Sequence, residues 1–124
     1  MLAPTKDKGM VIIYWTGGIL GTANRWSIYE NGKLLTDMMR RGAFYSYLAA
    51  PGELRLATRQ SLNWSSMVNL NWINSLSDKE QPTFRIEANH KYYLEMDSGS
   101  IKQVSAEEGE ESIENCHWIN PPSR

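Results

Sequence analysis

The sequence predicts an all-β fold, an antiparallel β-sandwich of about seven or eight short strands. Short stretches alternate between apolar and polar residues, which is the two-residue period of a strand with one buried face. Glycine, proline and asparagine separate these stretches and favour tight turns. Closely spaced strands with turns between them are typical of a sandwich or a barrel. Because 124 residues suit one hydrophobic core, we assign residues 1–124 to a single domain.

The first strands are predicted on either side of a glycine-rich stretch. Residues 10–15 form a continuous apolar run, MVIIYW, and its β-branched and aromatic residues are typical of a strand buried on both faces. Residues 25–30 and 33–37 alternate on either side of Asn31-Gly32. Asn-Gly is the strongest short signal for a hairpin because both residues tolerate positive φ. We therefore expect residues 25–37 to fold as a hairpin.

The remaining strands are predicted from the same alternation. Residues 44–48 and 53–58 are joined by a Pro-Gly turn. Residues 84–86 and 92–96 flank an Ala-Asn-His turn, and residues 101–104 follow the next turn. The result is a series of short antiparallel strands without long connections, apart from one inserted segment described below.

A helix is predicted only at the acidic end of the domain. It is expected within residues 106–116, with Ile113 and the sole cysteine, Cys116, facing inward. The spacing of its glutamates matches that of no calcium-binding loop, so we interpret them as the solvated face of the helix. They are Glu107, Glu108, Glu110 and Glu111. Residues 1–8 are expected to form a flexible N-terminus, and residues 117–124 a C-terminal tail.

The chain has five tryptophans, and their sequence contexts divide them. Trp15 and Trp26 lie in predicted strands and are expected in the core, since burying an indole removes about 150–250 Å² from water. Trp64 and Trp72 lie instead in the segment 60–81, within a repeated Leu-Asn-Trp triplet surrounded by asparagine and serine. If exposed together, they would form an aromatic surface for a sugar ring or a protein partner. The candidate binding residues are Trp64, Trp72, Asn63 and Asn71.

The local conformation of this segment stays open at the level of sequence. A period of two over residues 62–76 favours a strand, whereas the line of Trp64, Val68 and Trp72 at helical spacing favours a helix. Asparagine is unfavourable in the interior of both elements. Either way, the segment is predicted to be an insertion, and insertions on rigid β-frameworks often carry recognition.

Composition excludes several classes of function. The formal net charge of −1 gives no reason to expect nucleic acid as a partner, because nucleic-acid binders carry a concentrated basic face. No apolar run approaches the roughly 20 residues that span a bilayer. A single cysteine and two histidines, His90 and His117, provide no metal-ligand motif, so neither a metal nor another cofactor is expected.

One possible set of catalytic residues suggests an alternative function. Ser98, His90 and Asp97 are the residue types of a hydrolase triad, and they lie close together in sequence. No nucleophile elbow surrounds Ser98. The main hypothesis is therefore a non-enzymatic protein, and the alternative is a small envelope hydrolase that uses these three residues.

The order of the strand phrases resembles a bacterial lipoprotein family of unknown function from Gram-negative envelopes. The phrases are GMVIIYW, WSIYENGKLL, GAFYSYLAAPGELRLATR, IEANHKYYLEM and VSAEEGEESI, and together they cover most of residues 9–114. The resemblance implies a small all-β domain with no characterised catalytic site, usually anchored by a lipid on an N-terminal cysteine. The turn before the paired tyrosines departs from the family's pattern, because Asn89-His90 stands where relatives tend to have glycine.

The resemblance implies a place in the periplasm or at the outer membrane. This chain has no cysteine other than Cys116, so a lipid anchor would require a signal and a cysteine upstream of Met1, and without them the protein would be cytoplasmic. We thus expect a binding or structural module that contacts protein or glycan through the segment 60–81. Homodimerisation through an edge strand is a further possibility, because open sandwiches present unpaired backbone groups.

Overall fold

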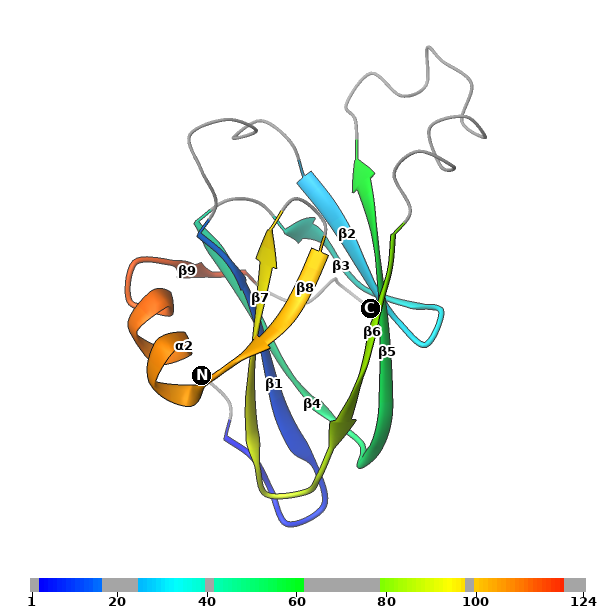
Figure 1. The fold of residues 1–124 in the computed structure, drawn as a ribbon, viewed down its shortest axis with the longest axis vertical. Helices are drawn as coiled ribbons and strands as arrows, with labels where there is room; N and C mark the ends of the chain where they lie inside the picture. The colour runs from blue at the N-terminus through cyan, green and yellow to red at the C-terminus, as the bar shows by residue number, and fades with distance from the viewer. Residues whose placement is uncertain (1–2, 17–24, 40–41, 62–78, 98–99, 120–124) are drawn as a thin grey trace.

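The computed structural model describes residues 3–16, 25–39, 42–61, 79–97 and 100–119, which form two facing β-sheets and one helix (Figure 1). Sheet A has the strand order β8-β7-β1-β4-β9, and sheet B has the order β3-β2-β5-β6. The all-β sandwich predicted from the sequence is confirmed. The elements are β1 (Gly9–Trp15), β2 (Arg25–Glu30), β3 (Lys33–Met39), β4 (Ala43–Ala49), β5 (Gly52–Ser61), β6 (Lys79–Ile86), β7 (Lys91–Asp97), β8 (Ser100–Val104), α2 (Ala106–Ile113) and β9 (His117–Trp118).

Two turns show how the local sequence sets the strand connections. Asn31 and Gly32 both have positive φ, 48° and 87°, and join β2 to β3 as the Asn-Gly signal predicted. Asn89 also has positive φ, 62°, in the turn before β7. Asparagine therefore takes the conformation that glycine would otherwise supply. Backbone contacts fix this turn, since Asn89 N donates to Lys8 O at 3.1 Å.

Strand β1 is the centre of sheet A and is buried along its whole length. It pairs antiparallel with β4 and parallel with β7, so sheet A is not antiparallel throughout. Hydrogen bonds on both edges and apolar neighbours on both faces explain why the MVIIYW run is continuous instead of alternating. Residue alternation alone carries no information about this parallel partner, which is distant in sequence.

Strand β9 is the one described strand that the sequence did not predict, and it corrects the prediction of a tail from residue 117 for the described residues 117–119. His117 N donates to Gly42 O and Ile119 N donates to Phe44 O, each at 2.9 Å. These bonds align β9 parallel to β4. Ile119 is buried in the core. Two paired residues are too few to show a periodic pattern, so this strand depends on tertiary contacts.

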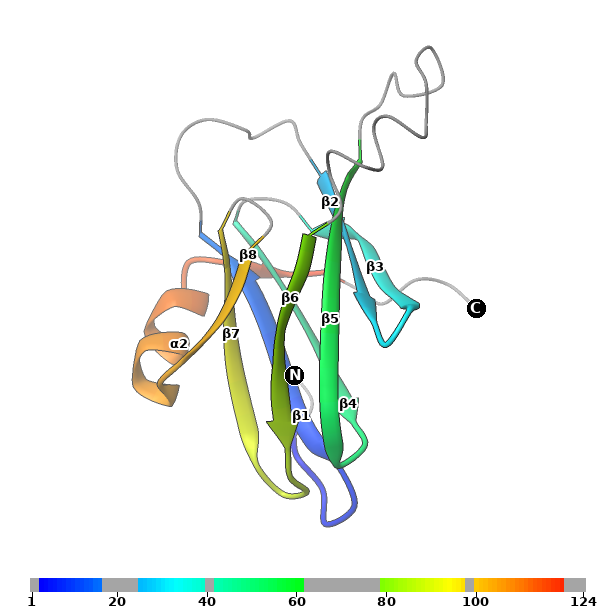
Figure 2. The same cartoon turned by 45° about the vertical axis from the view of Figure 1, so that its right-hand side comes forward.

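The main core lies between the two sheets and is formed by inward residues of β1 to β8, together with Ile119 after β9. Trp15 and Trp26 are 5% and 7% exposed, which confirms their prediction as core residues. From sheet B, Leu54 and Leu56 of β5 point inward with Phe84 and Ile86 of β6. Figure 2 separates the two layers, with sheet B on the right and α2 beyond sheet A on the left.

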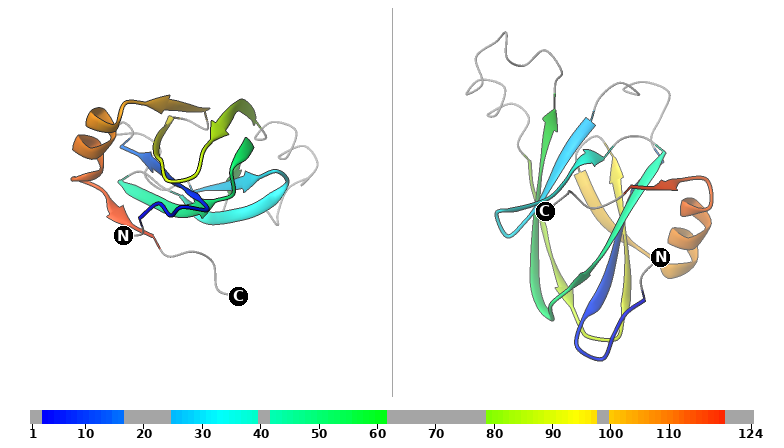
Figure 3. Two further views of the ribbon diagram at one scale, coloured as in Figure 1. Left: turned by 90° about the horizontal axis from the view of Figure 1, so that it is seen from below. Right: turned by 180° about the vertical axis from the view of Figure 1, so that it is seen from behind.

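The outer face of sheet A is covered by α2, which creates a second, smaller core. Met10, Ile12, Tyr14 and Tyr93 are buried there, with Ile113 of the helix packed against them. Figure 3 shows α2 on the side of sheet A that faces away from sheet B. By contrast, no described element covers the outer face of sheet B, where Arg55, Thr83 and Arg85 are exposed.

Candidate functional site

The predicted binding residues Trp64, Trp72, Asn63 and Asn71 lie outside the described residues, as does the whole range 62–76 whose conformation the sequence left open. The strands on either side are described. β5 ends at Ser61, β6 begins at Lys79, and the two strands pair antiparallel as far as Thr58 opposite Lys79. Residues 62–78 therefore connect two positions that the framework already holds side by side.

The structure does not bring together His90 and Asp97, two residues of the alternative catalytic triad. His90 precedes the first residue of β7, and Asp97 is its last residue. An extended strand of that length separates their Cα atoms by on the order of 20 Å, whereas a triad requires hydrogen-bond contact. The third residue, Ser98, lies outside the described residues. His90 is a turn residue, with Nδ1 2.8 Å from Ala88 O.

An open hollow of about 620 Å³ lies beside the end of β7 and the start of β8. Its lining includes Thr16, Asp97 and the ion pair of Glu95 with Lys102, whose atoms are 3.4 Å apart. Across residues 3–16, 25–39, 42–61, 79–97 and 100–119, no three His, Cys, Asp or Glu side chains gather as metal ligands. The lining thus carries two carboxylates, of which that of Glu95 forms an ion pair with the exposed Lys102.

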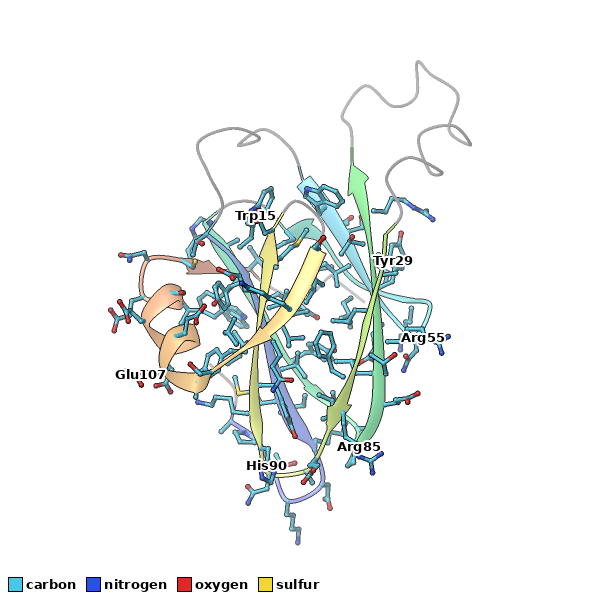
Figure 4. All side chains as sticks on the ribbon, viewed as in Figure 1. Trp15, Tyr29, Arg55, Arg85, His90 and Glu107 are labelled. Atoms are coloured by element: carbon cyan, nitrogen blue, oxygen red, sulfur yellow. The ribbon has the colours of Figure 1, made fainter. Side chains whose placement is uncertain are left out.

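The outer face of sheet B combines arginine with apolar side chains. On β5, Leu54 and Leu56 are buried while Arg55 between them is exposed, and on β6 Arg85 is exposed between two buried residues. Figure 4 shows Arg55 and Arg85 on the side of the molecule remote from α2. On β2, Tyr29 shares this face, with the guanidinium of Arg59 over its ring at 5.5 Å from the centroid.

Sequence reasoning missed this face, although part of the signal was available. The alternation around Arg55 predicts that its side chain points away from the core, but not which other side chains share its surface. The pairing of β5 with both β2 and β6 brings Tyr29 and Arg85 to the same face. Sequence reasoning also missed Trp118, which is 45% exposed on the edge strand β9.

Partly buried polar groups elsewhere form contacts within the fold. The Tyr47 hydroxyl donates to Glu30 Oε2 at 2.9 Å and links β4 of sheet A to β2 of sheet B. Burial raises the pKa of Tyr47 well above its ordinary value, and the Glu30 carboxylate adds to this effect. Cys116 is half-buried rather than fully buried, and its thiol lies 3.6 Å from Ser112 O. Burial also raises the pKa of Cys116, which disfavours the reactive thiolate.

Comparisons with models of known protein families, with curated proteins and with solved structures find no match to this chain. In the part of the chain that the structure describes, no helix is both long enough and apolar enough to cross a bilayer.

Proposed function

We propose that the protein is a non-enzymatic binding or structural module of the bacterial cell envelope, which contacts protein or glycan through the segment 60–81. The place in the envelope, periplasmic or at the outer membrane as in lipoproteins, follows from the sequence resemblance of residues 9–114. The role of the segment follows from its position between β5 and β6.

The observation that carries the proposal is the length of chain inserted between two strands that are already adjacent. Thr58 lies opposite Lys79, and the usual hairpin connection between such positions takes about two to five residues. The chain instead places residues 62–78 after the end of β5. Pairing of the two strands does not need this length, so we assign the segment to contact with a partner.

The residue types in the segment support this role. Trp64 and Trp72 are the largest apolar side chains in it, and asparagine precedes each of them. Tryptophan is enriched among the residues that dominate binding energy at protein interfaces, and its ring also stacks on sugars. Asparagine supplies hydrogen bonds to either kind of partner.

A loop replacement tests the proposal. Substituting Asn-Gly for residues 62–78 leaves a short connection after Ser61, so we expect the shortened protein to keep its β-type circular dichroism and its cooperative unfolding. The full chain should cosediment with isolated peptidoglycan or form crosslinks in an envelope fraction, and the shortened chain should do neither. A full chain carrying Trp64→Ala and Trp72→Ala is the matched variant, and it should lose the same contact.

Two results would contradict the proposal. If the shortened chain failed to fold, the segment would belong to the framework. If it folded and still bound the envelope material as the full chain does, the contact surface would lie elsewhere. Placement in the envelope has its own test, which is metabolic labelling of the natural protein with a fatty acid, followed by cell fractionation.

A further inference from the structure

The outer face of sheet A changes character along its length. Where α2 packs on it, the buried side chains are apolar or aromatic, as with Ile12 and Tyr93. Further along β7, the next outward residues are Glu95 and Asp97, and both line the hollow of about 620 Å³. Small-molecule sites usually measure about 300–1,000 Å³. This end of the face therefore offers a polar hollow of the size that a small ligand needs.

The pairing of β7 with β8 arranges the polar lining in two rows. Asp97 lies opposite Ser100, and Glu95 lies opposite Lys102. All four belong to one face of this strand pair, because side chains alternate with a period of two. β1 runs parallel to β7 on its other side, and Thr16 directly follows β1. Polar side chains from three neighbouring segments thus line one hollow.

The lining combines hydrogen-bond donors with acceptors. The carboxylates of Glu95 and Asp97 accept, the Lys102 ammonium donates, and the hydroxyls of Thr16 and Ser100 do both. Glu95 is paired with Lys102, and Asp97 also interacts within the chain. A carboxylate has about four acceptor positions, so one partner does not exhaust it.

This combination selects among the classes of ligand. An anionic ligand would meet the two carboxylates, and a simple cation would meet the ammonium of Lys102. Each hydroxyl of a sugar can both donate and accept, so a sugar can use every group in the lining. The mixture of donors and acceptors therefore favours a neutral ligand with several hydroxyls.

The described lining has no exposed apolar anchor for a protein partner. Its apolar residues are Met96 and Ile101, which belong to the main core and are only 1% and 3% exposed. Protein partners take most of their binding energy from a few large side chains that fill desolvated pockets. The lining thus suits a hydrophilic ligand better than an apolar or aromatic side chain.

The hollow also lies at the end of the sandwich where β5 stops and β6 starts. β6 runs from Lys79 to Ile86, and β7 returns from Lys91 to Asp97, so Lys79 and Asp97 belong to the same end. Figures 1 and 2 show the end of β5 and the start of β6 in the upper part of the molecule, with the end of β7 and the start of β8. A glycan chain can therefore reach both the hollow and the segment 60–81.

We propose that this hollow binds a neutral sugar residue, so that the ligand of this end of the molecule is a glycan. The sugar hydroxyls donate to Glu95 and Asp97, and they accept from Lys102, Thr16 and Ser100. The inference deepens the proposed function and rests on it for the choice of partner, because a glycan is one of the two classes that the proposed function allows.

Chitotetraose, a neutral oligomer of N-acetylglucosamine, is the probe, and the full-length protein is titrated with it. The titration should shift the backbone amide NMR signals of residues 95–97 and 100–102 in a saturable way. Because the ligand carries no charge, its affinity should stay the same when the salt concentration is raised.

A double variant tests the hydroxyls of the lining. Thr16→Val and Ser100→Ala together remove two hydroxyls, and the loss of two hydrogen bonds should weaken chitotetraose binding about tenfold. Thr83→Val, an exposed change on sheet B, is the matched control and should bind as the parent does. Circular dichroism should be the same for all of these proteins, since each position is exposed.

Several results would overturn the inference. Chitotetraose would fail to bind saturably, or it would shift only signals outside residues 95–102, or the double variant would bind it as tightly as the parent. Spermidine and a galacturonate oligomer are the charged comparisons. Tighter binding of either one than of chitotetraose would overturn the inference in favour of a cation or an anion.

The shortened chain that lacks residues 62–78 separates this inference from the proposed function. It should still bind chitotetraose, with the same loss in the double variant. If the shortened chain kept full contact with envelope material, the proposed function would fail while the sugar site stood. If chitotetraose bound neither chain, the sugar site would fail while a protein partner of the segment stood.

Discussion

At the scale of single residues, a tyrosine and a glutamate join the two layers of the sandwich. Tyr47 of β4 is partly buried against the main core, and Glu30 comes from β2. The hydroxyl donates to a carboxylate in a partly buried setting, where hydrogen bonds to charged groups contribute more than neutral ones. Alternation predicts the side of the strand on which each residue lies, but it cannot predict that the two residues meet.

A double-mutant cycle measures this link. Tyr47→Phe should lower the free energy of unfolding by about 1.5–3 kcal/mol, because Glu30 loses its donor while the ring stays in place. In a chain that already carries Glu30→Ala, Tyr47→Phe should lower the free energy of unfolding by a clearly smaller amount. Urea unfolding of the four proteins gives the coupling energy. Equal costs in both backgrounds would show that the hydrogen bond contributes nothing to stability.

At the scale of elements, α2 docks on sheet A through a glycine. Ser105 caps the helix by accepting from Glu108 N at 3.1 Å, and the backbone of Gly109 lies directly on the ring of Tyr93. A Cβ at Gly109 would overlap that ring. The Tyr93 hydroxyl donates to Glu110 Oε2 at 3.3 Å, which fixes the helix on the same tyrosine. The close approach thus explains a glycine within a helix, where glycine is otherwise unfavourable.

Gly109→Ala tests this packing against intrinsic helix preference. Helix propensity alone predicts that alanine raises the free energy of unfolding by about 1 kcal/mol. Overlap of the new Cβ with the Tyr93 ring predicts instead a net decrease of about 1–3 kcal/mol. We expect the loss, measured as a lower urea midpoint with an unchanged slope. Glu111→Ala, an exposed change in the same helix, should stay within about 0.5 kcal/mol of the parent. A stabilised Gly109→Ala protein would show that the helix does not pack on Tyr93 in this way.

At the scale of the whole molecule, buried tyrosines link stability to pH. Burial, together with the Glu110 carboxylate, raises the pKa of Tyr93 to about 12, and the pKa of Tyr47 is also raised. In the unfolded chain both hydroxyls titrate near their ordinary pKa of 10.0. The unfolded state therefore releases these protons at lower pH than the folded state, and rising pH favours unfolding.

Below pH 10.0 we expect these tyrosines to leave the free energy of unfolding unchanged. As the pH rises from there to about 12, the raised pKa of Tyr93, they should reduce the free energy of unfolding progressively. Urea midpoints measured across that range provide the check. In the double variant Tyr47→Phe and Tyr93→Phe the loss over the same range should be smaller. If parent and variant lost stability in parallel, other groups would account for the alkaline unfolding.

Much of the fold follows from local patterns. A continuous apolar run located β1, and alternating stretches with turn residues located β2 to β8, although β6 begins at Lys79 rather than at Phe84. The helix predicted within residues 106–116 is α2. The positive φ values of Asn31 and Asn89 occur where the sequence predicted turns. The candidate site was less predictable, because two-residue periodicity separates inward from outward side chains without assigning neighbours.

The sequence by itself determined the fold class, the position of the hairpin at Asn31-Gly32 and the burial of Trp15 and Trp26, since each depends on residues close together in the chain. Tertiary structure alone decided that β1 runs parallel to β7, that residues 117–119 complete sheet A, and that Tyr29 and Arg85 share a face with Arg55. These features depend on strand order and register, which arise from contacts between segments far apart in sequence.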